Sequence, residues 1–461
     1  MAKRRSNPNS GTSIMALPLV ILVDILLKLS TKSIVYCKCV CKTWRAAISD
    51  PQFAKMHFKQ AKAYPLIRDL YPTRISRTLY LNEPGDGGCD SCNIEVKVDT
   101  NLRVPIRNSQ VMIHQNKPSV VFFGKYRPGM HCIKINAEDH RYHLVNSCNG
   151  LLCLAAPSKC PAKTVVVCNP VTGEYINLWS FPNTLPFGIT KIVICCGLGF
   201  CSKSNQFKVV RVCHLFDRGV PSSHKIVMAE IQALGTGEWR DVDNCPGMWW
   251  VQEGATYLDG ALHWMCIDYQ ESEHIVSFDL ENEQFYLLPL PPLAPDHPFK
   301  NEKVYNLSMG AVGGCLCVCD PPSSYLLDEP CDVWIMKYYG VHDSWTKLFS
   351  IASPILEMNM TIDPHANCCF PISLDNGAFL MFYSSEKLQA LVYYDQRGLK
   401  LKHLKLRPLS KFQAIAHTPS FIPLKDMLMV GDNVEILNVN SGCGNLKLLE
   451  ETYPLTLGPN Q

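Results

Sequence analysis

Cysteine and histidine pairs at close spacing are the residues of this sequence that could hold a metal ion or take part in redox chemistry. Cys89 and Cys92 form a Cys-x-x-Cys pair in a loop rich in Gly and Asp, and His140 and His143 have the same spacing. A structural zinc site takes four ligands, and the cysteine pair has no obvious partner pair. A redox role would need a βαβ context, which the surrounding sequence lacks. We therefore expect no metal site and no cofactor.

The other cysteines favour packing over chemistry. Cys37, Cys39 and Cys41 lie two residues apart on helical segments, so adjacent thiols point away from one another. The neighbouring pairs at 195–196 and 368–369 are expected to pack in strands. The sequence has 23 cysteines, an odd number, and many lie in apolar runs. This usage favours a reducing compartment.

Catalytic motifs are missing from the sequence, which contains no G-x-S-x-G, no phosphate-binding P-loop and no H-E-x-x-H. The formal net charge is +3, so no electrostatic argument favours nucleic-acid binding. The apolar run 14–27 is interrupted by Pro18 and Asp24 and is too short to span a bilayer. We expect a soluble, non-catalytic protein of the cytoplasm and/or nucleus, with no nucleic-acid or membrane partner.

Residues 14–60 have the spacing of three or four short helices. The segment 19–29 is almost entirely apolar, and apolar residues in 40–48 recur at i, i+3/i+4 and i+7. Asp50 followed by Pro51 is typical of an N-cap and a first helical residue. Because so small a bundle has a limited core, we expect it to bind a partner.

From about residue 75 the pattern changes to short runs rich in Val, Ile, Tyr and Phe, with turn residues between them. The strands expected include 77–82, 119–126, 164–168, 208–213, 225–231, 274–280, 332–338 and 391–394. No convincing long helix follows residue 60.

A repeat organises these strands. Each of four copies starts with a glycine and an apolar strand, and a second strand follows that ends at a polar turn. The glycines are Gly150, Gly260, Gly314 and Gly377. The interval to the closing Asn or Asp is 19 residues in the first two copies and 18 in the fourth. The third copy carries an insertion at 320–330, and 199–242 looks like a divergent copy.

Such repeats favour a β-propeller of the kelch kind over the alternative, a stack of β-sandwiches. We predict a small all-α module followed by a large all-β domain, a six- or seven-bladed propeller. The expected divisions are a disordered tail (1–13), the helical module (14–60), a linker (61–75), the propeller (76–440) and a C-terminal segment (441–461).

The N-terminal motifs resemble a plant-type F-box. They are Leu17-Pro18, Ile-Leu-Leu-Lys-Leu-Ser at 25–30, Lys32-Ser33, the Cys-Val-Cys-Lys-Thr-Trp-Arg element at 39–45, and 48–53. Segments at 146–153, 169–173, 197–200, 207–211, 239–240, 260–264 and 275–279 resemble the F-box-associated domain of those proteins. Two departures stand out. Leu19 and Val20 occupy the place of the usual acidic residue, and Ser30 replaces a frequent proline.

The resemblance implies a substrate-recognition subunit of an SCF-type E3 ubiquitin ligase. The F-box would dock on the Skp adaptor, and through it on a cullin-based ligase. The candidate adaptor contacts are Leu17, Pro18, Ile21, Leu22, Ile25, Leu26, Val40, Cys41 and Trp44. The alternative for each of these residues is a place in the core of the module. We expect no catalytic residue, since such a receptor acts by holding its substrate close to the transferring enzyme.

Two other functions remain open from the sequence. One is a propeller lectin or enzyme with an incidental helical N-terminus, and the other is an F-box scaffold without ubiquitin transfer. For an unknown protein substrate, the candidate anchors are Trp249 and Trp250, in the long loop 244–254. Exposed tryptophan is a frequent hot spot. The alternative is that both rings fill the groove between two blades.

Overall fold

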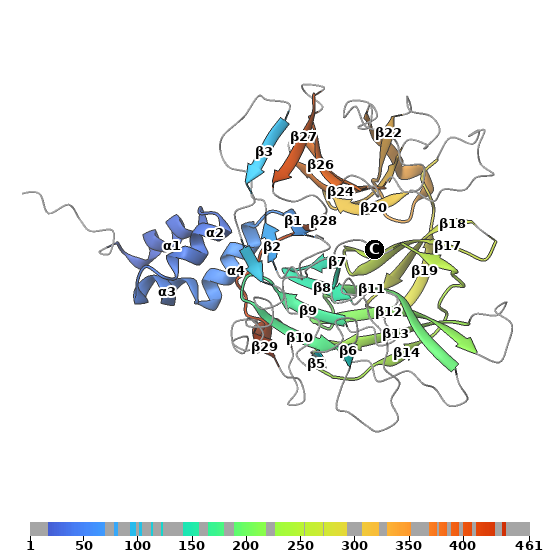
Figure 1. Ribbon diagram of the computed structural model, residues 1–461, viewed down its shortest axis with the longest axis horizontal. Coiled ribbons are helices and arrows are strands. Elements are labelled where there is room, and N and C mark those ends of the chain that lie inside the picture. The colour runs from blue at the N-terminus through green and yellow to red at the C-terminus, as the bar shows by residue number, and fades with distance from the viewer. Residues whose placement is uncertain are drawn as a thin grey trace, which may run out of the picture.

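The computed structural model places a short helical part beside a large all-β part (Figure 1). The described residues are 17–69, 78–81, 93–97, 101–103, 112–113, 121–122, 142–155, 165–178, 189–217, 226–252, 254–270, 272–292, 307–321, 330–351, 368–375, 378–384, 389–395, 400–407, 412–428 and 436–438.

Four helices form the N-terminal module: α1 (Leu19–Leu27), α2 (Thr31–Cys37), α3 (Lys42–Ile48) and α4 (Pro51–Gln60). The N-cap predicted at Asp50 is confirmed, and Ser30 is the N-cap of α2. The Ser30 hydroxyl accepts a hydrogen bond from the backbone N–H of Ser33 (3.3 Å), and Asp50 Oδ1 accepts one from Gln52 (2.7 Å). Pro51 stands at the start of α4, where its missing N–H costs nothing.

Within the described residues, the strands form six sheets of four or five strands, together with the pair β5 (Met112–Ile113) and β6 (Val121–Phe122). Sheet I contains β28 (Phe412–His417), β1 (Tyr64–Asp69), β2 (Thr78–Leu81) and β4 (Asn101–Arg103). Sheet II contains β7 (His143–Cys148), β8 (Leu151–Ala155), β9 (Val165–Asn169), β10 (Glu174–Leu178) and β29 (Leu437–Asn438). Sheet III contains β11 (Ile189–Cys201), β12 (Gln206–Asp217), β13 (Ile226–Ala233) and β14 (Arg240–Val242).

The remaining three sheets follow in chain order. Sheet IV contains β15 (Trp250–Val251), β16 (Thr256–Leu258), β17 (Ala261–Ile267), β18 (Glu273–Asp279) and β19 (Gln284–Leu288). Sheet V contains β20 (Ser308–Val312), β21 (Cys315–Asp320), β22 (Cys331–Met336) and β23 (Trp345–Ile351). Sheet VI contains β24 (Cys368–Asp375), β25 (Ala378–Ser384), β26 (Gln389–Asp395), β27 (Lys400–Arg407) and β3 (Asn93–Lys97).

All eight expected strands overlap strands of the structure. After α4, the helical elements among the described residues are the 3-10 turn η4 (His342–Ser344) and the four-residue helix α6 (Leu424–Met427). The architecture is thus a helical module followed by a large, propeller-like all-β domain.

Each sheet contacts the next one in chain order, and sheet VI contacts sheet I, so the sheets follow one another around a ring (Figure 1). The ring is closed within sheet I, where β1 pairs antiparallel with β28, from the other end of the domain. Strand β1 lies inside the range 61–75 that we expected to be a linker. It is a paired strand because its partner arrives from far away in sequence.

The predicted repeat corresponds to antiparallel strand pairs within sheets. The pairs are β8–β9, β17–β18, β21–β22 and β25–β26. Gly150, Gly260 and Gly314 have φ values of 84°, 84° and 76°, and each residue before them also has a positive φ. Two-residue hairpin turns require this backbone conformation, which explains the glycine at the start of each copy. Gly377 lies outside the described residues.

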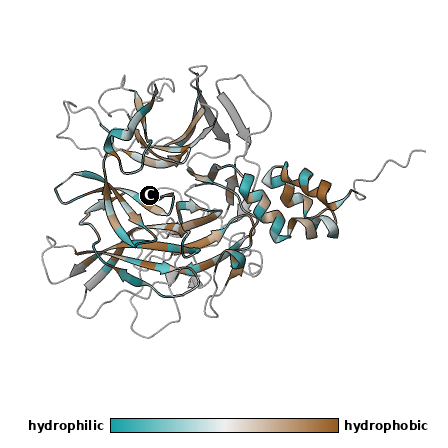
Figure 2. Cartoon of the chain, turned by 180° about the vertical axis from the view of Figure 1, so that it is seen from behind, coloured by the Kyte–Doolittle hydropathy of each residue, from teal (hydrophilic) through white to brown (hydrophobic). Residues whose placement is uncertain are grey.

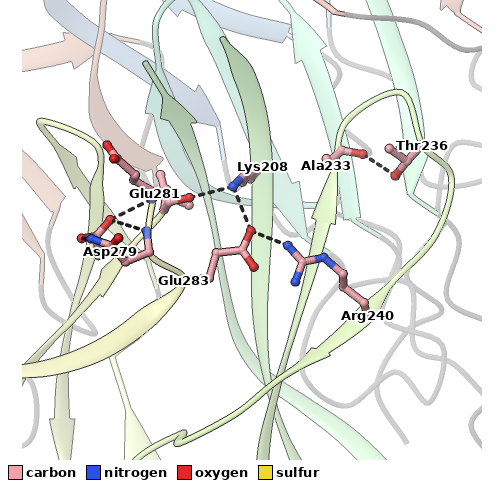
Figure 3. A network of polar contacts seen from close by, with 9 residues as sticks. Lys208, Ala233, Thr236, Arg240, Asp279, Glu281 and Glu283 are labelled. Atoms are coloured by element: carbon pink, nitrogen blue, oxygen red, sulfur yellow. Dashed lines mark hydrogen bonds and ion pairs between the residues drawn. The ribbon is translucent and has the colours of Figure 1, made fainter. Parts of the chain in front are cut away.

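A polar network joins sheets III and IV at one edge (Figure 3). Lys208 Nζ on β12 donates to the Leu280 carbonyl (2.7 Å) and to Glu283 Oε1 (2.9 Å). Arg240 on β14 also binds the Glu283 carboxylate. Although burial raises the pKa of Glu283, the hydrogen bonds from Arg240 and Lys208 lower it below its ordinary value. The carboxylate therefore holds two strands of sheet III against sheet IV.

Candidate functional site

The helical module leaves a set of large apolar side chains in solvent. We call them the module surface. They are Leu19 (58% exposed), Val20 (73%), Ile21 (47%), Ile25 (38%), Tyr36 (63%) and Val40 (55%). Figure 2 shows that much of the module is coloured as hydrophobic. Exposed apolar residues grouped on one small element are typical of a surface that binds another protein.

The core of the module is formed by other residues. Leu22, Leu26, Ile34 and Ile48 are each at most 3% exposed, and they pack in one cluster with Phe53. Because this core is complete without the module surface, the exposed side chains are available to a partner.

The nine predicted adaptor contacts separate into two groups. Pro18, Ile21, Ile25 and Val40 are exposed, and Leu17 and Cys41 are half-buried. The buried group lies in the core of the module and consists of Leu22, Leu26 and Trp44. Trp44 is only 8% exposed, so its ring stabilises the module from within.

Sequence reasoning missed three members of the module surface: Leu19, Val20 and Tyr36. The first two stand where an acidic residue is usual in the resembling family, and they were treated as departures. The available signal was an apolar first turn on a helix whose only polar residue is Asp24, since such a helix cannot bury every face in a four-helix module.

The module is attached to the propeller through a shared core. Phe421, which follows β28, is 3% exposed and packs with the module residues Phe53 and Ala54. The His57 ring contacts the Phe421 ring edge-on, with centroids 4.9 Å apart. Lys38 Nζ lies 5.2 Å from the centre of the same Phe421 ring. The position of the module relative to the ring is therefore set by side-chain packing.

Two family comparisons agree with this division of the chain. The F-box domain family matches residues 14–56, and the F-box associated beta propeller domain family matches residues 92–424. This chain belongs to the F-box proteins with an F-box-associated β-propeller domain. The resemblance inferred from the sequence motifs is confirmed.

Relatives of this F-box protein include two from Arabidopsis thaliana. An F-box/kelch-repeat protein is 25% identical over 343 residues, covering 73% of this chain and 79% of the relative. An F-box protein is 24% identical over 445 residues, covering 88% and 92%. Among solved structures, TolB from Acinetobacter baumannii is 10% identical with a TM-score of 0.40, and the match covers 82% of this chain and 73% of that chain. So low a score supports no functional comparison.

The predicted substrate anchors of the F-box protein lie on the edge of sheet IV. Trp249 is 39% exposed, while Trp250 is half-buried and belongs to β15. The preceding residue, Met248, is 2% exposed, and its carbonyl lies 2.8 Å from His214 Nε2. The segment is therefore held in place by the buried Met248, while the Trp249 ring is partly exposed to solvent. Most of the other two expected binding loops, 289–303 and 320–331, lies outside the described residues.

A cleft of about 580 Å³ opens between sheets IV and V, and sequence reasoning did not find it. Tyr286 and Tyr339 line it and are 45% and 51% exposed. The Tyr339 hydroxyl lies 2.7 Å from His263 Nε2 and 2.7 Å from Ser277 Oγ. Burial lowers the pKa of His263 to about 4, so the imidazole that supports the tyrosine is neutral at neutral pH. The two tyrosines make this cleft a second candidate surface for a protein partner.

Most of the cysteine and histidine pairs that the sequence places at metal-ligand spacing lie outside the part of the chain that the structure describes. Cys89, Cys92 and His140 lie outside it, and His143 is a half-buried residue of β7. Within the described ranges, no three His, Cys, Asp or Glu side chains are grouped closely enough to hold a metal ion. The same ranges contain no helix with the length and apolarity needed to cross a membrane.

The cysteines expected to pack in strands do so. Cys195 and Cys196 lie on β11 and are buried, and Cys369 on β24 is fully buried beside the half-buried Cys368. Burial raises the pKa of the Cys168 and Cys266 thiols to about 12, which keeps them protonated and unreactive.

Proposed function

We propose that this F-box protein is the substrate-recognition subunit of an SCF-type E3 ubiquitin ligase. Its module surface binds the Skp adaptor, which links it to a cullin, and its propeller captures a protein substrate. The observation that carries this proposal is the exposed apolar surface on a module whose own core is complete. A lectin or an enzyme with incidental helices would leave this surface without a purpose.

The adaptor contacts that we propose are the exposed members of the predicted set, Pro18, Ile21, Ile25 and Val40, with Leu17 and Cys41 at the margin. Leu22, Leu26 and Trp44 contribute by holding α1 and α3 in place. Recognition of this kind uses apolar side chains from one helical face as anchors in a groove of the partner.

The proposed role is not catalytic. A receptor raises the effective concentration of the substrate near an enzyme that another subunit carries. Packing of Phe421 into the module supports this role, because a fixed angle between the module and the propeller limits where a captured substrate can lie. The proposed location is the cytoplasm and/or nucleus.

Trp249 and the cleft between Tyr286 and Tyr339 are the substrate-binding surfaces that we propose on the propeller. In each surface an exposed aromatic ring lies next to buried residues that hold it in place, Met248 for Trp249 and His263 for Tyr339. Binding hot spots commonly have this arrangement. Six blades, one for each four- or five-stranded sheet, are the proposed blade number, and the β1–β28 pairing supports ring closure.

The adaptor proposal is tested by calorimetry of the full chain with a purified Skp adaptor. Ile21→Asp should weaken binding by about 2 kcal/mol or more, because it places a charge in an apolar interface. Ile226→Asp is the matched control, since Ile226 is 63% exposed on the propeller. Equal affinities for the two variants would exclude the module surface as the adaptor site.

Trp44→Ala separates the two ways of losing adaptor binding. Since Trp44 is buried in the module, its truncation should lower the stability of the module together with adaptor affinity. Ile21→Asp should lower the affinity alone. If Trp44→Ala lowers the affinity with an unchanged melting temperature, the ring contacts the adaptor directly.

Substrate capture is tested by affinity purification and mass spectrometry with and without proteasome inhibition. Proteins that accumulate on the wild-type chain only under inhibition are candidate substrates. Capture should survive Ile21→Asp and be lost in Trp249→Ala or Tyr339→Ala. A captured protein whose abundance is insensitive both to inhibition and to Ile21→Asp would indicate a scaffold without ubiquitin transfer.

A further inference from the structure

A cavity of about 330 Å³ lies between strands of several sheets. Figure 1 shows the lining strands β7, β20, β24 and β28 around the middle of the ring. Lining residues come from β7, β16, β20, β24 and β28, thus from every sheet except sheet III. A volume of this size falls in the range of small-molecule sites, roughly 300–1,000 Å³.

None of the described residues that line this cavity is an Asp, Glu, Lys, Arg or His. One part is apolar and includes Met309, Phe370, Pro371 and Phe382. Another part carries the amides of Gln252 and Gln413. A charged ligand would lose its hydration here without meeting a counter-charge, which is unfavourable. The composition therefore selects an uncharged ligand.

The two glutamine amides are each oriented by a backbone partner. Gln252 Nε2 donates to the Leu307 carbonyl (3.1 Å), and Gln413 Oε1 accepts from the Leu144 N–H (3.3 Å). Because a carbonyl can only accept and an N–H can only donate, these contacts settle which end of each amide is which. Within the described part of the chain, Gln252 Oε1 and Gln413 Nε2 take part in no further hydrogen bond.

The cavity thus offers one hydrogen-bond acceptor from sheet IV and one donor from sheet I, next to apolar side chains. We propose that it binds a small uncharged molecule that carries a carboxamide-like group on an apolar ring. The N–H of such a group donates to Gln252 Oε1, and its carbonyl or hydroxyl oxygen accepts from Gln413 Nε2. Such a ligand contacts several sheets at once and so stabilises the ring.

Three probes of the same shape test this site on the full chain by saturation-transfer NMR: benzamide, benzoate and benzamidinium. Benzamide should bind, and the two charged probes should bind much more weakly. Gln252→Leu and Gln413→Leu should each weaken benzamide binding about tenfold, because a polar group of the ligand then loses its partner. Gln284→Leu is the matched control, since Gln284 is exposed on the outer strand β19.

Gln252→Glu provides a second, nearly isosteric variant, which covers the case that a leucine variant fails to fold. A carboxylate at this position should reverse the preference, so that benzamidinium binds better than benzamide. The proposal is overturned if benzamide binds no better than benzoate to the wild-type chain, or if the order of the three probes is the same in Gln252→Glu.

Discussion

The rings of His57 and Phe421 meet edge-on, with centroids 4.9 Å apart and planes at 85°. His57 belongs to the last helix of the F-box module, and Phe421 follows the last strand of the ring-closing pair. Nearby, the Asn169 side-chain amide donates to the carbonyls of Ser420 (3.0 Å) and Ile422 (2.9 Å). The chain segment that carries Phe421 is thus held by sheet II while its ring enters the module.

Phe421→Ala should uncouple the two parts of the protein. Removing a buried phenylalanine ring costs about 3 kcal/mol or more, and here the loss falls on the contact between module and propeller. In calorimetric melting, we expect the module to unfold at a lower temperature than the propeller. Tyr338→Ala, at a residue 72% exposed, is the control and should leave the melting profile unchanged. A single transition in Phe421→Ala would show that other contacts hold the module.

Acidification should weaken the same contact. Burial lowers the pKa of His57 to about 4, below the value of about 6.5 for an exposed histidine. As the pH falls from about 6.5 towards 4, the unfolded chain binds a proton that the folded chain does not, so stability falls. The stability that the neutral His57 side chain contributes is fully present above about pH 6.5. Urea unfolding at pH 7 and pH 5 measures this difference.

His57→Phe isolates this contribution from those of His263 and His417, whose pKa values are also lowered by burial. The variant should lose less stability than the wild-type chain between pH 7 and pH 5. An equal loss in both proteins would assign the pH dependence to the other two histidines.

Gly150→Ala should destabilise the protein more than Gly260→Ala does. Both glycines have a φ of 84°, so alanine is strained equally at the two turns. A Cβ at Gly150 would come within 2.3 Å of Ser420 Cβ, whereas no heavy atom lies within 4 Å at Gly260. Chemical denaturation of the two variants therefore separates the strain of a left-handed backbone conformation, roughly 1–2 kcal/mol for an L-residue, from the clash. Equal losses would mean that the segment at Ser420 moves aside.

Lys208→Met should destabilise the contact between sheets III and IV by about 2 kcal/mol, because it leaves the Leu280 carbonyl and part of the Glu283 carboxylate without a donor. Lys203→Met is the matched control, since the Lys203–Glu281 pair (2.6 Å) is exposed to solvent. Exposed pairs contribute little, so this control should unfold like the wild-type chain. Similar effects of the two substitutions would argue against a role for burial.

Local signals in the sequence were enough to predict the helices and the hairpins. Asp50-Pro51 caps α4 because a capping carboxylate and a proline act on their immediate neighbours. Gly150 and Gly260 mark hairpins because their backbone conformation excludes most other residues. Repeated four times in the sequence, the glycine signal was sufficient to predict a ring of strand pairs, whereas the family was inferred from the F-box motifs.

Tertiary structure alone decided which apolar residues of the module face solvent. Helix α1 is apolar on nearly every side, so its periodicity could not separate the exposed Ile21 from the buried Leu22. The sequence predicts a linker at strand β1, because the hydrogen-bond partner of this strand, β28, comes from the far end of the domain. Likewise, Gln252 and Gln413 share a cavity only because the ring closes. Contacts between distant segments depend on packing, which short-range patterns do not encode.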